Sequence, residues 1–324
     1  MLCTLWVTMS NVVEVSNLIK HFEVKTGFFS TTTKTVKAVD DISFNIKKGE
    51  SLGLVGQSGC GKTTTARLMT LLEEKTSGDI KFLDDDSNTL INLDSIDDEN
   101  IQNFRSQVQM IFQDPYESLN PRWTIKNIVS EPLNIHNLGS DDDRLQAVSE
   151  MLTTVGLTPS KNYMDRYPHE LSGGQRQRVS IARALIMKPK FVICDEPTSM
   201  LDVSIRISIM DLMTNLAKDL GVSYLYITHD LAVARYMCER IAVMFNGKIV
   251  EIGETEELLK NPLHPYTKRL ISSIPIPDPT YKRENYELDF TEINNIINSS
   301  SGKDMIEVKK GHFVSSKDFS SELK

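Results

Sequence analysis

The stretch Gly56–Thr63, with the sequence GQSGCGKT, fits the pattern G-x-x-x-x-G-K-[ST] at every fixed position. The residues before it, Ser51–Val55, are mostly apolar, which is typical of a buried parallel strand. Thr64–Leu72 has the spacing of a helix, with Ala66 and Met69 on one side. A strand, a glycine-rich turn and a helix start together place backbone N–H groups around an anion. The stretch therefore predicts a nucleoside triphosphate site in an α/β fold, and the alternative is a glycine-rich turn before an ordinary helix.

Each fixed residue of this loop has a chemical reason to be there. Gly56, Gly59 and Gly61 permit positive φ and a close approach of the backbone to phosphate. We expect Lys62 to reach the β- and γ-phosphates and the Thr63 hydroxyl to bind Mg²⁺. The loop by itself does not say what the energy of the nucleotide is used for.

Composition excludes several classes of protein. The chain of 324 residues has a net charge of −8, which argues against general nucleic-acid binding by bulk electrostatics. No apolar run approaches the roughly 20 residues of a membrane-spanning helix. The four cysteines, Cys3, Cys60, Cys194 and Cys238, form no C-x-x-C pair, so neither a zinc site nor a disulfide framework is predicted. We interpret them as small packing residues in a reducing compartment.

The opening region is predicted to hold strands before the loop. Residues 1–11 are interpreted as an extension, in which Met9 is an alternative start. Val12–Ile19 and Val39–Ile46 alternate apolar and polar residues and predict strands, whereas the polar segment Lys25–Lys37 predicts a loop. Phe22 is a candidate for stacking on adenine, and the alternative is a core aromatic.

The middle of the chain is predicted to change from strands to helices. Asp79–Phe82 and Gln107–Gln113 predict strands, and residues 116–188 have a helical texture. Within it, Thr124–Asn134 and Arg144–Val155 predict helices, the second with Asp141–Asp143 as N-cap carboxylates. The apolar stripe expected on that second helix consists of Leu145, Val148, Met151, Leu152 and Val155.

A second helix start with exposed N–H groups is predicted at Ser172. Ser172, Gly173 and Gly174 precede a helix over Arg176–Met187, which makes them a candidate second anion site. The alternative is a simple serine N-cap.

Two further strands are expected to carry polar residues to the edge where α/β sheets bind ligands. Phe191–Asp195 is apolar and delivers Asp195, a candidate for the Mg²⁺ shell, and Glu196, a candidate for polarising an attacking water. His229 follows a strand over Val222–Ile227 and is expected at the same edge. Between them we expect a helix over Ser204–Leu220, ended by Gly221.

With these pieces in order, the chain resembles the ATP-binding cassette (ABC) ATPases over residues 12–260. Gly56–Thr63 is similar to the Walker A loop, Gln113 to the Q-loop glutamine and Leu171–Gln175 to the LSGGQ signature. Asp195 and Glu196 match Walker B and its catalytic glutamate. Asp202 matches the D-loop aspartate, His229 the switch histidine and Phe22 the A-loop aromatic. Met200 departs from the usual small residue of the D-loop.

The resemblance implies a P-loop NTPase (RecA-like) core with an antiparallel β subdomain and a helical signature-motif subdomain at about 116–188. It implies catalytic roles for Glu196, His229 and Gln113, and Mg²⁺ binding by Thr63, Gln113 and Asp195. The residues implied to bind ATP are Phe22, Gly56, Ser58, Gly59, Cys60, Gly61, Lys62, Thr63, Thr64, Ser172, Gly173, Gly174, Gln175 and Asp202.

Other segments narrow the resemblance to the oligopeptide/dipeptide importer branch. Residues 36–44, 113–122 and 261–268 look like that branch, and the segment from Glu307 is similar to its F-type ATPase subunits. No cysteine follows Cys238, so the C-terminal cysteine cluster of some subunits is absent. Residues 261–324 are expected to form a C-terminal extension of this type, partly disordered.

The branch implies an ATP-hydrolysing subunit on the cytoplasmic face of a membrane. One Walker A loop and one signature per chain imply a head-to-tail dimer with a related, non-identical ATPase subunit. Two permeases and, indirectly, an extracellular peptide-binding lipoprotein are the other expected partners, with no nucleic acid. The same machinery importing nickel or a metal chelate is the alternative. A soluble, non-transport ABC ATPase is disfavoured because the span from Lys62 to Leu171 holds no long heptad run.

Overall fold

The computed structural model describes residues 11–25, 33–84, 89–273 and 305–315, and the chain divides into two units. The first unit contains residues up to 14, 45–50 and 80–225, and the second contains residues 15–44, 51–79 and those from 226 onward. The expected N-terminal extension over residues 1–11 lies outside the described residues except for Asn11, which begins a strand. Residues 293–301 and 315–324, which the sequence predicts to be mobile, also lie outside them except for Ser315, which ends a strand. None of the described helices has the length and apolar character needed to cross a bilayer.

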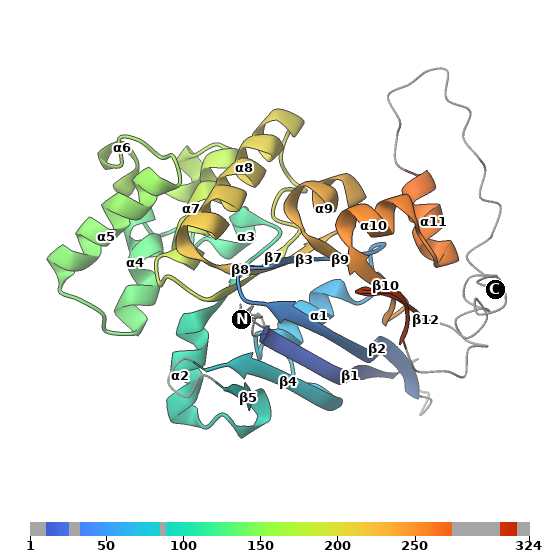
Figure 1. The fold of residues 1–324 in the computed structure, drawn as a ribbon. Helices are drawn as coiled ribbons and strands as arrows, with labels where there is room; N and C mark the ends of the chain where they lie inside the picture. The colour runs from blue at the N-terminus through green and yellow to red at the C-terminus, as the bar shows by residue number, and fades with distance from the viewer. Residues whose placement is uncertain (1–10, 26–32, 85–88, 274–304, 316–324) are drawn as a thin grey trace, which may run out of the picture. The chain divides into compact units, whose positions relative to one another are not determined.

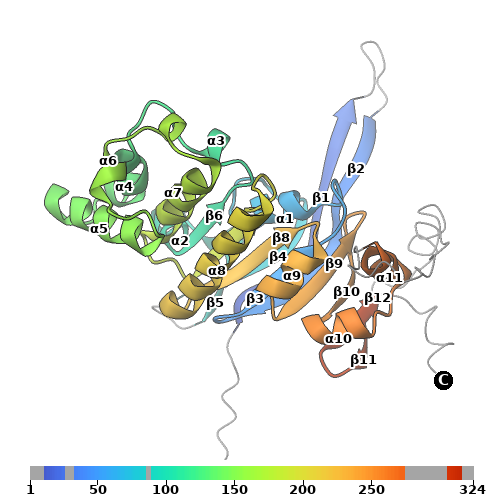
Figure 2. The same ribbon diagram turned by 90° about the horizontal axis from the view of Figure 1, so that it is seen from above.

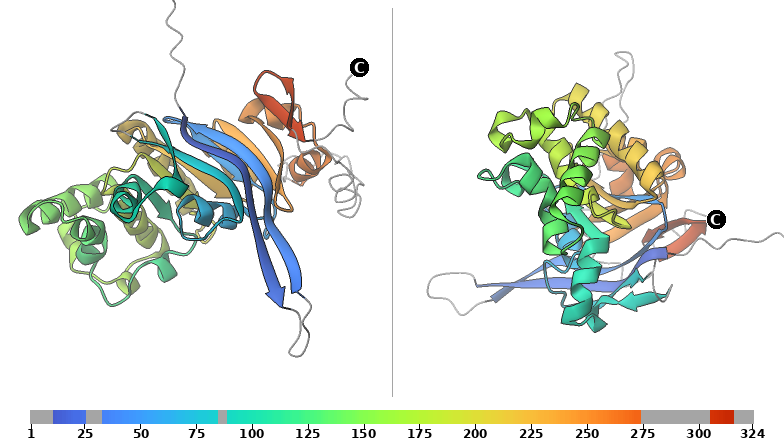
Figure 3. Two further views of the ribbon diagram at one scale, coloured as in Figure 1. Left: turned by 90° about the horizontal axis from the view of Figure 1, so that it is seen from below. Right: turned by 90° about the vertical axis from the view of Figure 1, so that its left-hand side faces the viewer.

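A four-stranded sheet has the order β2-β1-β4-β5. Its strands are β1 (Asn11–Lys25), β2 (Thr33–Lys47), β4 (Ser77–Leu83) and β5 (Leu90–Asn92). Figure 3 shows β1 and β2 as two long neighbouring strands. The loop predicted over Lys25–Lys37 is wrong at its end, because β2 already begins at Thr33. Its Thr and Val residues favour an extended backbone, and pairing with β1 outweighs the polar composition.

The larger sheet includes the strand that leads into the glycine loop. The strands that belong to the second unit have the order β11-β12-β10-β9-β3-β8, and those that belong to the first have the order β8-β7-β6. Strand β8 appears in both because the division between the units falls within it. The strands are β3 (Ser51–Val55), β6 (Val108–Ile111), β7 (Phe191–Asp195), β8 (Ser223–Thr228), β9 (Arg240–Phe245), β10 (Lys248–Glu254), β11 (Met305–Lys309) and β12 (His312–Ser315). β3 pairs with β9 in parallel, and β6 pairs with β7 in parallel. Parallel and antiparallel pairs therefore coexist, and together with the helices they confirm the predicted α/β class.

The helices of the first unit are α2 (Asp98–Gln107), α3 (Pro115–Ser118), α4 (Ile125–Ile135), α5 (Asp141–Thr154), α6 (Lys161–Met164), α7 (Gly173–Leu185) and α8 (Val203–Leu220), with short 3₁₀ turns at Leu93–Ser95 and Pro168–Glu170. Figure 1 shows α4, α5 and α7 packed together. Val148 and Leu152 of α5 are buried as expected, whereas Leu145 is 48% exposed. The predicted stripe is wrong at Leu145, which lies one turn before the buried part of the face.

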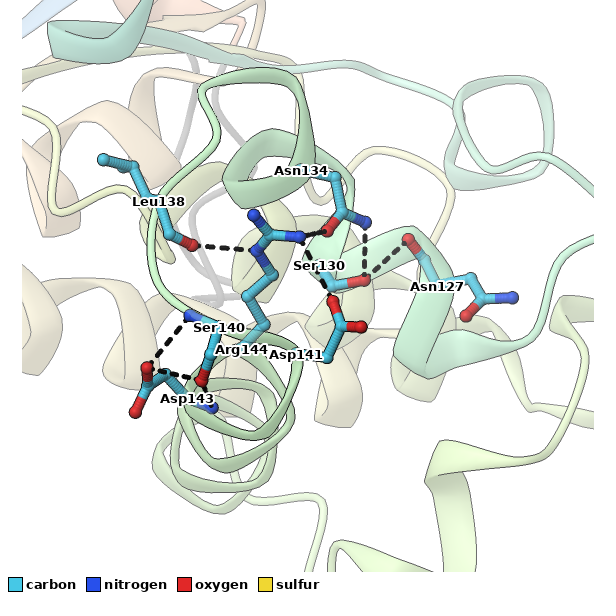
Figure 4. A network of polar contacts seen from close by, with 8 residues as sticks. All are labelled: Asn127, Ser130, Asn134, Leu138, Ser140, Asp141, Asp143 and Arg144. Carbon is cyan, nitrogen blue, oxygen red and sulfur yellow. Dashed lines mark hydrogen bonds and ion pairs between the residues drawn. The ribbon is translucent and has the colours of Figure 1, made fainter.

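Ser140 is the N-cap of α5, rather than the three aspartates that follow it. Its hydroxyl accepts from the Asp143 N–H at 3.3 Å, and the Asp143 carboxylate accepts from the Ser140 N–H at 2.9 Å (Figure 4). These two hydrogen bonds form a capping box. The hydrogen bonds from Ser140 also hold the pKa of the Asp143 carboxyl below its usual value.

Arg144 closes the turn between α4 and α5. Its Nε donates to the Leu138 carbonyl at 2.8 Å, and its Nη1 donates to Asn134 Oδ1 at 2.9 Å (Figure 4). One acceptor is a side-chain oxygen in the last turn of α4 and the other is a backbone carbonyl of the turn that follows, so Arg144 links the turn to both helices.

The helices of the second unit are α1 (Lys62–Met69), α9 (Leu231–Met237), α10 (Thr255–Lys260) and α11 (Pro265–Ser272). The turn Asn246-Gly247 joins β9 to β10 with both residues at positive φ, as the predicted hairpin requires. Later in the chain, β11 and β12 form a second hairpin, and β12 pairs with β10 (Figure 2). Within residues 261–324, expected to form a partly disordered extension, residues 305–315 thus form a hairpin that the sequence pattern did not predict.

Candidate nucleotide site

The glycine loop is pressed between neighbouring backbone segments. A Cβ at Gly56 would lie 2.1 Å from the Met244 carbonyl oxygen, at the end of β9. A Cβ at Gly61 would lie 2.1 Å from the Ala38 carbonyl oxygen, and Gly61 has φ +111°. These two positions accept glycine alone, because any larger residue would displace backbone. The close approach expected from the sequence is therefore present at Gly56 and Gly61, whereas positive φ is present at Gly59 and Gly61 and not at Gly56.

Lys62 lies inside the loop that it ends. Its ammonium group donates to the Gly56 carbonyl at 2.6 Å and to the Gln57 carbonyl at 3.0 Å, and the residue is 5% exposed. Cys60 Sγ lies 3.9 Å from the same nitrogen, and burial raises the pKa of the Cys60 thiol. The Lys62 ammonium is thus held against the loop backbone, and its contact with phosphate stays a prediction.

Helix α1 begins directly at Lys62, two residues earlier than predicted, and it ends at Met69. Thr63 and Thr64 therefore lie in its first turn, Thr63 exposed and Thr64 half-buried. The first-turn N–H groups have no acceptor within the helix, so this end favours an anion. Ser58 and Gly59 are exposed in the loop before it.

Two other candidates lie in the same unit as the loop. His229 is exposed directly after β8, which neighbours β3 in the strand order. Phe22 is half-buried on β1, with the Lys20 ammonium 4.6 Å from the centre of its ring. A ring with one accessible part suits stacking, and its contact with adenine stays a prediction.

In the first unit, the parallel pair of β6 and β7 brings three candidates to one edge. Ile111 is paired with Cys194, so Gln113 and Asp195 both follow the carboxyl ends of their strands. Gln113 Nε2 donates to Ser199 Oγ at 3.5 Å, and Ser199 Oγ donates to the Glu196 carbonyl at 3.0 Å. Asp195 and Glu196 therefore lie at the carboxyl end of β7, as predicted, and Gln113 lies near them at the end of β6.

Glu196 has an unusual backbone. Its φ is +45°, in the left-handed region, directly after the buried Asp195. Its carbonyl also accepts from the Ser199 N–H at 3.2 Å. A non-glycine residue in this region costs of the order of 1–3 kcal/mol and is concentrated at functional sites. The turn directs the chain sharply away from β7, and the Glu196 side chain is half-buried rather than enclosed.

The signature segment opens α7 with a capping box. The Ser172 hydroxyl accepts from the Gln175 N–H at 3.3 Å, and Gln175 Oε1 accepts from the Ser172 N–H at 3.0 Å. A Cβ at Gly174 would lie 2.6 Å from Ile205 Cγ2 of α8, so glycine permits the close packing of the two helices. Ser172 is therefore the N-cap of α7, as the alternative interpretation expected. A capped helix start can still bind an anion through its remaining N–H groups.

The loop after β7 has room for Met200, which replaces the small residue usual in the D-loop. Met200 is 64% exposed, whereas Leu201 beside it is buried. Asp202 is exposed at the N-cap of α8 and makes no side-chain capping bond. The larger residue therefore adds exposed surface and leaves the buried packing of the loop unchanged.

The sequence analysis did not identify the contacts of two residues in the second unit, Tyr266 and Glu251. Tyr266 Oη accepts from the Gln57 N–H at 3.0 Å, which joins α11 to the glycine loop. Glu251, fully buried on β10, accepts from the N–H groups of Leu263 and His264, each at 2.9 Å. Tyr266 lies in a segment quoted for the resemblance, but no local pattern indicates which residue it contacts.

The buried His264 gives the protein an expected pH dependence of stability. Its Nδ1 accepts from the Tyr266 N–H at 3.1 Å, which requires an unprotonated nitrogen. Burial lowers the pKa of His264 from 6.5 to about 4, against the attraction of Glu251 and with the help of Lys268. As the pH falls, His264 becomes protonated in the unfolded chain at a higher pH than in the folded protein. The free energy of unfolding should therefore fall as the pH drops from 6.5 to about 4. The loss is of the order of 3 kcal/mol at about 1.4 kcal/mol per pH unit.

We expect His264→Asn to weaken this dependence, because the amide oxygen can still cap α11 and does not titrate. Urea unfolding at pH 5 and pH 7.5 measures the difference. His169→Asn, at an exposed histidine, is the matched control. An equal pH slope in wild type and His264→Asn would contradict the expectation.

The strand β3, the glycine loop and the helix α1 define a nucleotide-binding protein of the P-loop class. Residues 39–199 match the family model described as ABC transporter. Residues 250–300 match the model described as oligopeptide/dipeptide transporter, C-terminal region. The chain belongs to the ABC transporter family, as an ATP-binding cassette and an ATPase.

Similar proteins cover most of the chain. It is 47% identical over 304 residues to the oligopeptide transport ATP-binding protein OppF of Bacillus subtilis, spanning 94% of this chain and 95% of that protein. It is 44% identical over 295 residues to OppF of Escherichia coli, spanning 90% and 86%. Among solved structures, the dimeric post-hydrolysis ATP-binding cassette MJ0796 with ADP and Pi is similar, with a TM-score of 0.63 and 30% identity over 75% of this chain and 98% of that one.

Proposed function

We propose that this chain is the energy-coupling ATPase subunit of an ABC importer for oligopeptides or dipeptides, acting at the cytoplasmic face of a membrane. The observation that carries the proposal is the similarity to OppF of Bacillus subtilis along 95% of that protein's length. The match of residues 250–300 to the oligopeptide/dipeptide transporter C-terminal region supports it, because that region is separate from the cassette match.

In this function the loop residues bind the triphosphate. The Lys62 ammonium, already directed into the loop, neutralises charge on the β- and γ-phosphates, and the N–H groups of the loop and of the first turn of α1 surround them. Glu196 orients and polarises the attacking water, since its carboxylate can accept the proton. His229 and Gln113 act at the γ-phosphate from the ends of β8 and β6.

Mg²⁺ fits the donors available for it. The Thr63 hydroxyl, the Asp195 carboxylate and the Gln113 amide supply the oxygen ligands that this cation prefers. When bound, the cation neutralises charge that develops on the phosphate oxygens. Asp195 is 5% exposed, so its carboxylate is shielded from bulk water at the end of β7.

A complete site requires two cassettes. The start of α7, with the exposed Ser172, the half-buried Gly173 and the buried Gly174, would serve the γ-phosphate held by a partner cassette, and Gln175 and Asp202 would lie at that interface. We propose a related, non-identical ATPase subunit as the partner, together with two permeases and, indirectly, a peptide-binding lipoprotein. The dimeric cassette with ADP and Pi among the similar structures supports the pairing of two cassettes.

The test is transport in a strain that lacks this gene. We expect the strain to lose uptake of labelled di- and oligopeptides and the wild-type gene to restore it, whereas a gene carrying Glu196→Gln should not. Uptake of radioactive nickel is measured in the same cells. Unchanged peptide uptake with lost nickel uptake would overturn the peptide assignment and favour the metal alternative.

A further inference from the structure

The glycine loop is held by two hydrogen bonds from other parts of the second unit. The Gly247 N–H, in the β9–β10 turn, donates to the Cys60 carbonyl at 2.9 Å. The Gln57 N–H donates to Tyr266 Oη at 3.0 Å, across 209 residues of sequence. The second contact comes from α11, which lies outside the cassette match and inside the C-terminal match.

Tyr266 is itself rigidly held. It is 1% exposed, and the centre of its ring lies 4.3 Å from that of Phe245. It belongs to a buried cluster that includes Val55, the residue immediately before the loop. Burial raises the pKa of the Tyr266 hydroxyl to about 12, so the group stays protonated and neutral at physiological pH.

The main chain around Tyr266 is fixed by Glu251. The Glu251 carboxylate accepts from the Leu263 and His264 N–H groups and from His312 Nε2 of β12, the last at 2.8 Å. His264 then caps the first turn of α11 through the Tyr266 N–H. A buried carboxylate with three donors is well satisfied, so this segment forms a firm base for the tyrosine.

The loop has little freedom on its other side. A Cβ at Gly56 would lie 2.1 Å from the Met244 carbonyl oxygen, so the loop backbone passes close to β9 and leaves no room there for a side chain. The direction of the Gln57 N–H sets the first bend of the loop. Binding strength depends on how far a loop is already arranged for its ligand, because ordering it otherwise lowers the affinity.

We propose that Tyr266 is a positioning residue for the phosphate loop, and that its hydroxyl holds the Gln57 amide so that the loop is arranged for the triphosphate of ATP. The proposal rests on the assignment of Gly56–Thr63 to phosphate binding. It makes the C-terminal segment of the chain part of the nucleotide site, although no residue of that segment needs to touch nucleotide.

Tyr266→Phe tests the proposal, because it keeps the ring packed on Phe245 and removes only the hydroxyl. In the full-length chain we expect the dissociation constant for a fluorescent ATP analogue to rise about 3- to 10-fold, the size of one lost hydrogen bond. In the assembled transporter the KM for ATP should rise by a similar factor, with kcat changed less than twofold. Tyr224→Phe, at another fully buried tyrosine, is the matched control and should bind as wild type does.

Two outcomes would overturn the inference. One is Tyr266→Phe binding nucleotide as tightly as wild type. The other is a weaker affinity that Tyr224→Phe shares in proportion to a common loss of melting temperature, which would indicate general destabilisation. Lys62→Ala in the same assay distinguishes a failure of the Tyr266 proposal from a failure of the assignment of the loop to phosphate binding. Tight nucleotide binding by Lys62→Ala would mean that the loop does not bind phosphate at all.

Discussion

Replacing Glu196 by glutamine should slow ATP hydrolysis by about a hundredfold or more while ATP still binds. A hundredfold change corresponds to about 2.7 kcal/mol in the barrier, the usual size when a group that acts on the reacting atoms is lost. Glutamine has the same shape, and the Glu196 carbonyl would still accept from the Ser199 N–H and hydroxyl. The turn after β7 should therefore keep its form, and the loss should be chemical.

Phosphate release by the assembled transporter measures the rate, and size-exclusion chromatography with ATP detects a trapped, closed pair of cassettes. Glu150→Gln, at an exposed acid on α5, is the matched control and should hydrolyse ATP at the wild-type rate. Wild-type turnover by the Glu196→Gln protein would refute the role assigned to this carboxylate.

The second large effect is expected at Lys62. Lys62→Ala removes the cation inside the loop and leaves the Gly56 and Gln57 carbonyls without the ammonium that they now accept from. Both changes make the loop less favourable for a triphosphate, so we expect ATP affinity to fall by about 10- to 100-fold, and hydrolysis with it.

Isothermal titration with Mg-ATP measures this affinity. Lys48→Ala is the control, because Lys48 is exposed in the turn before β3. Lys62→Arg adds a second comparison, since it keeps the charge but not the compact shape that fits between two loop carbonyls. Equal affinity of the Lys62→Ala and Lys48→Ala proteins would contradict the assigned role of Lys62.

Local patterns predicted the parts of the fold that depend on neighbouring residues. β3 and β7 were predicted at their observed bounds, because short apolar strands are bounded by turn residues on both sides. The Asn246-Gly247 hairpin and the end of α8 at Gly221 follow from backbone preferences of single residues.

The remaining features depend on residues far apart in the sequence. β2 starts earlier than its composition predicts, because β1 supplies hydrogen-bond partners. Tyr266 and Gln57 are 209 residues apart, and Glu251 and His312 are 61 residues apart, so no window of the sequence contains either pair. Ser140 was missed as a cap because three aspartates follow it and suit the same helix end.

The hairpin of β11 and β12 has a consequence for how the protein behaves at high concentration. By pairing with β10, the hairpin occupies backbone N–H and C=O groups that would otherwise lie on an exposed edge strand. Exposed edge strands are a common starting point for aggregation between chains. The new edge strand is β11, whose side chains include Glu307 and Lys309, and Lys309 forms an ion pair with Glu257 at 2.8 Å. Charged, short edge strands of this kind resist self-association, so these last described residues also protect solubility.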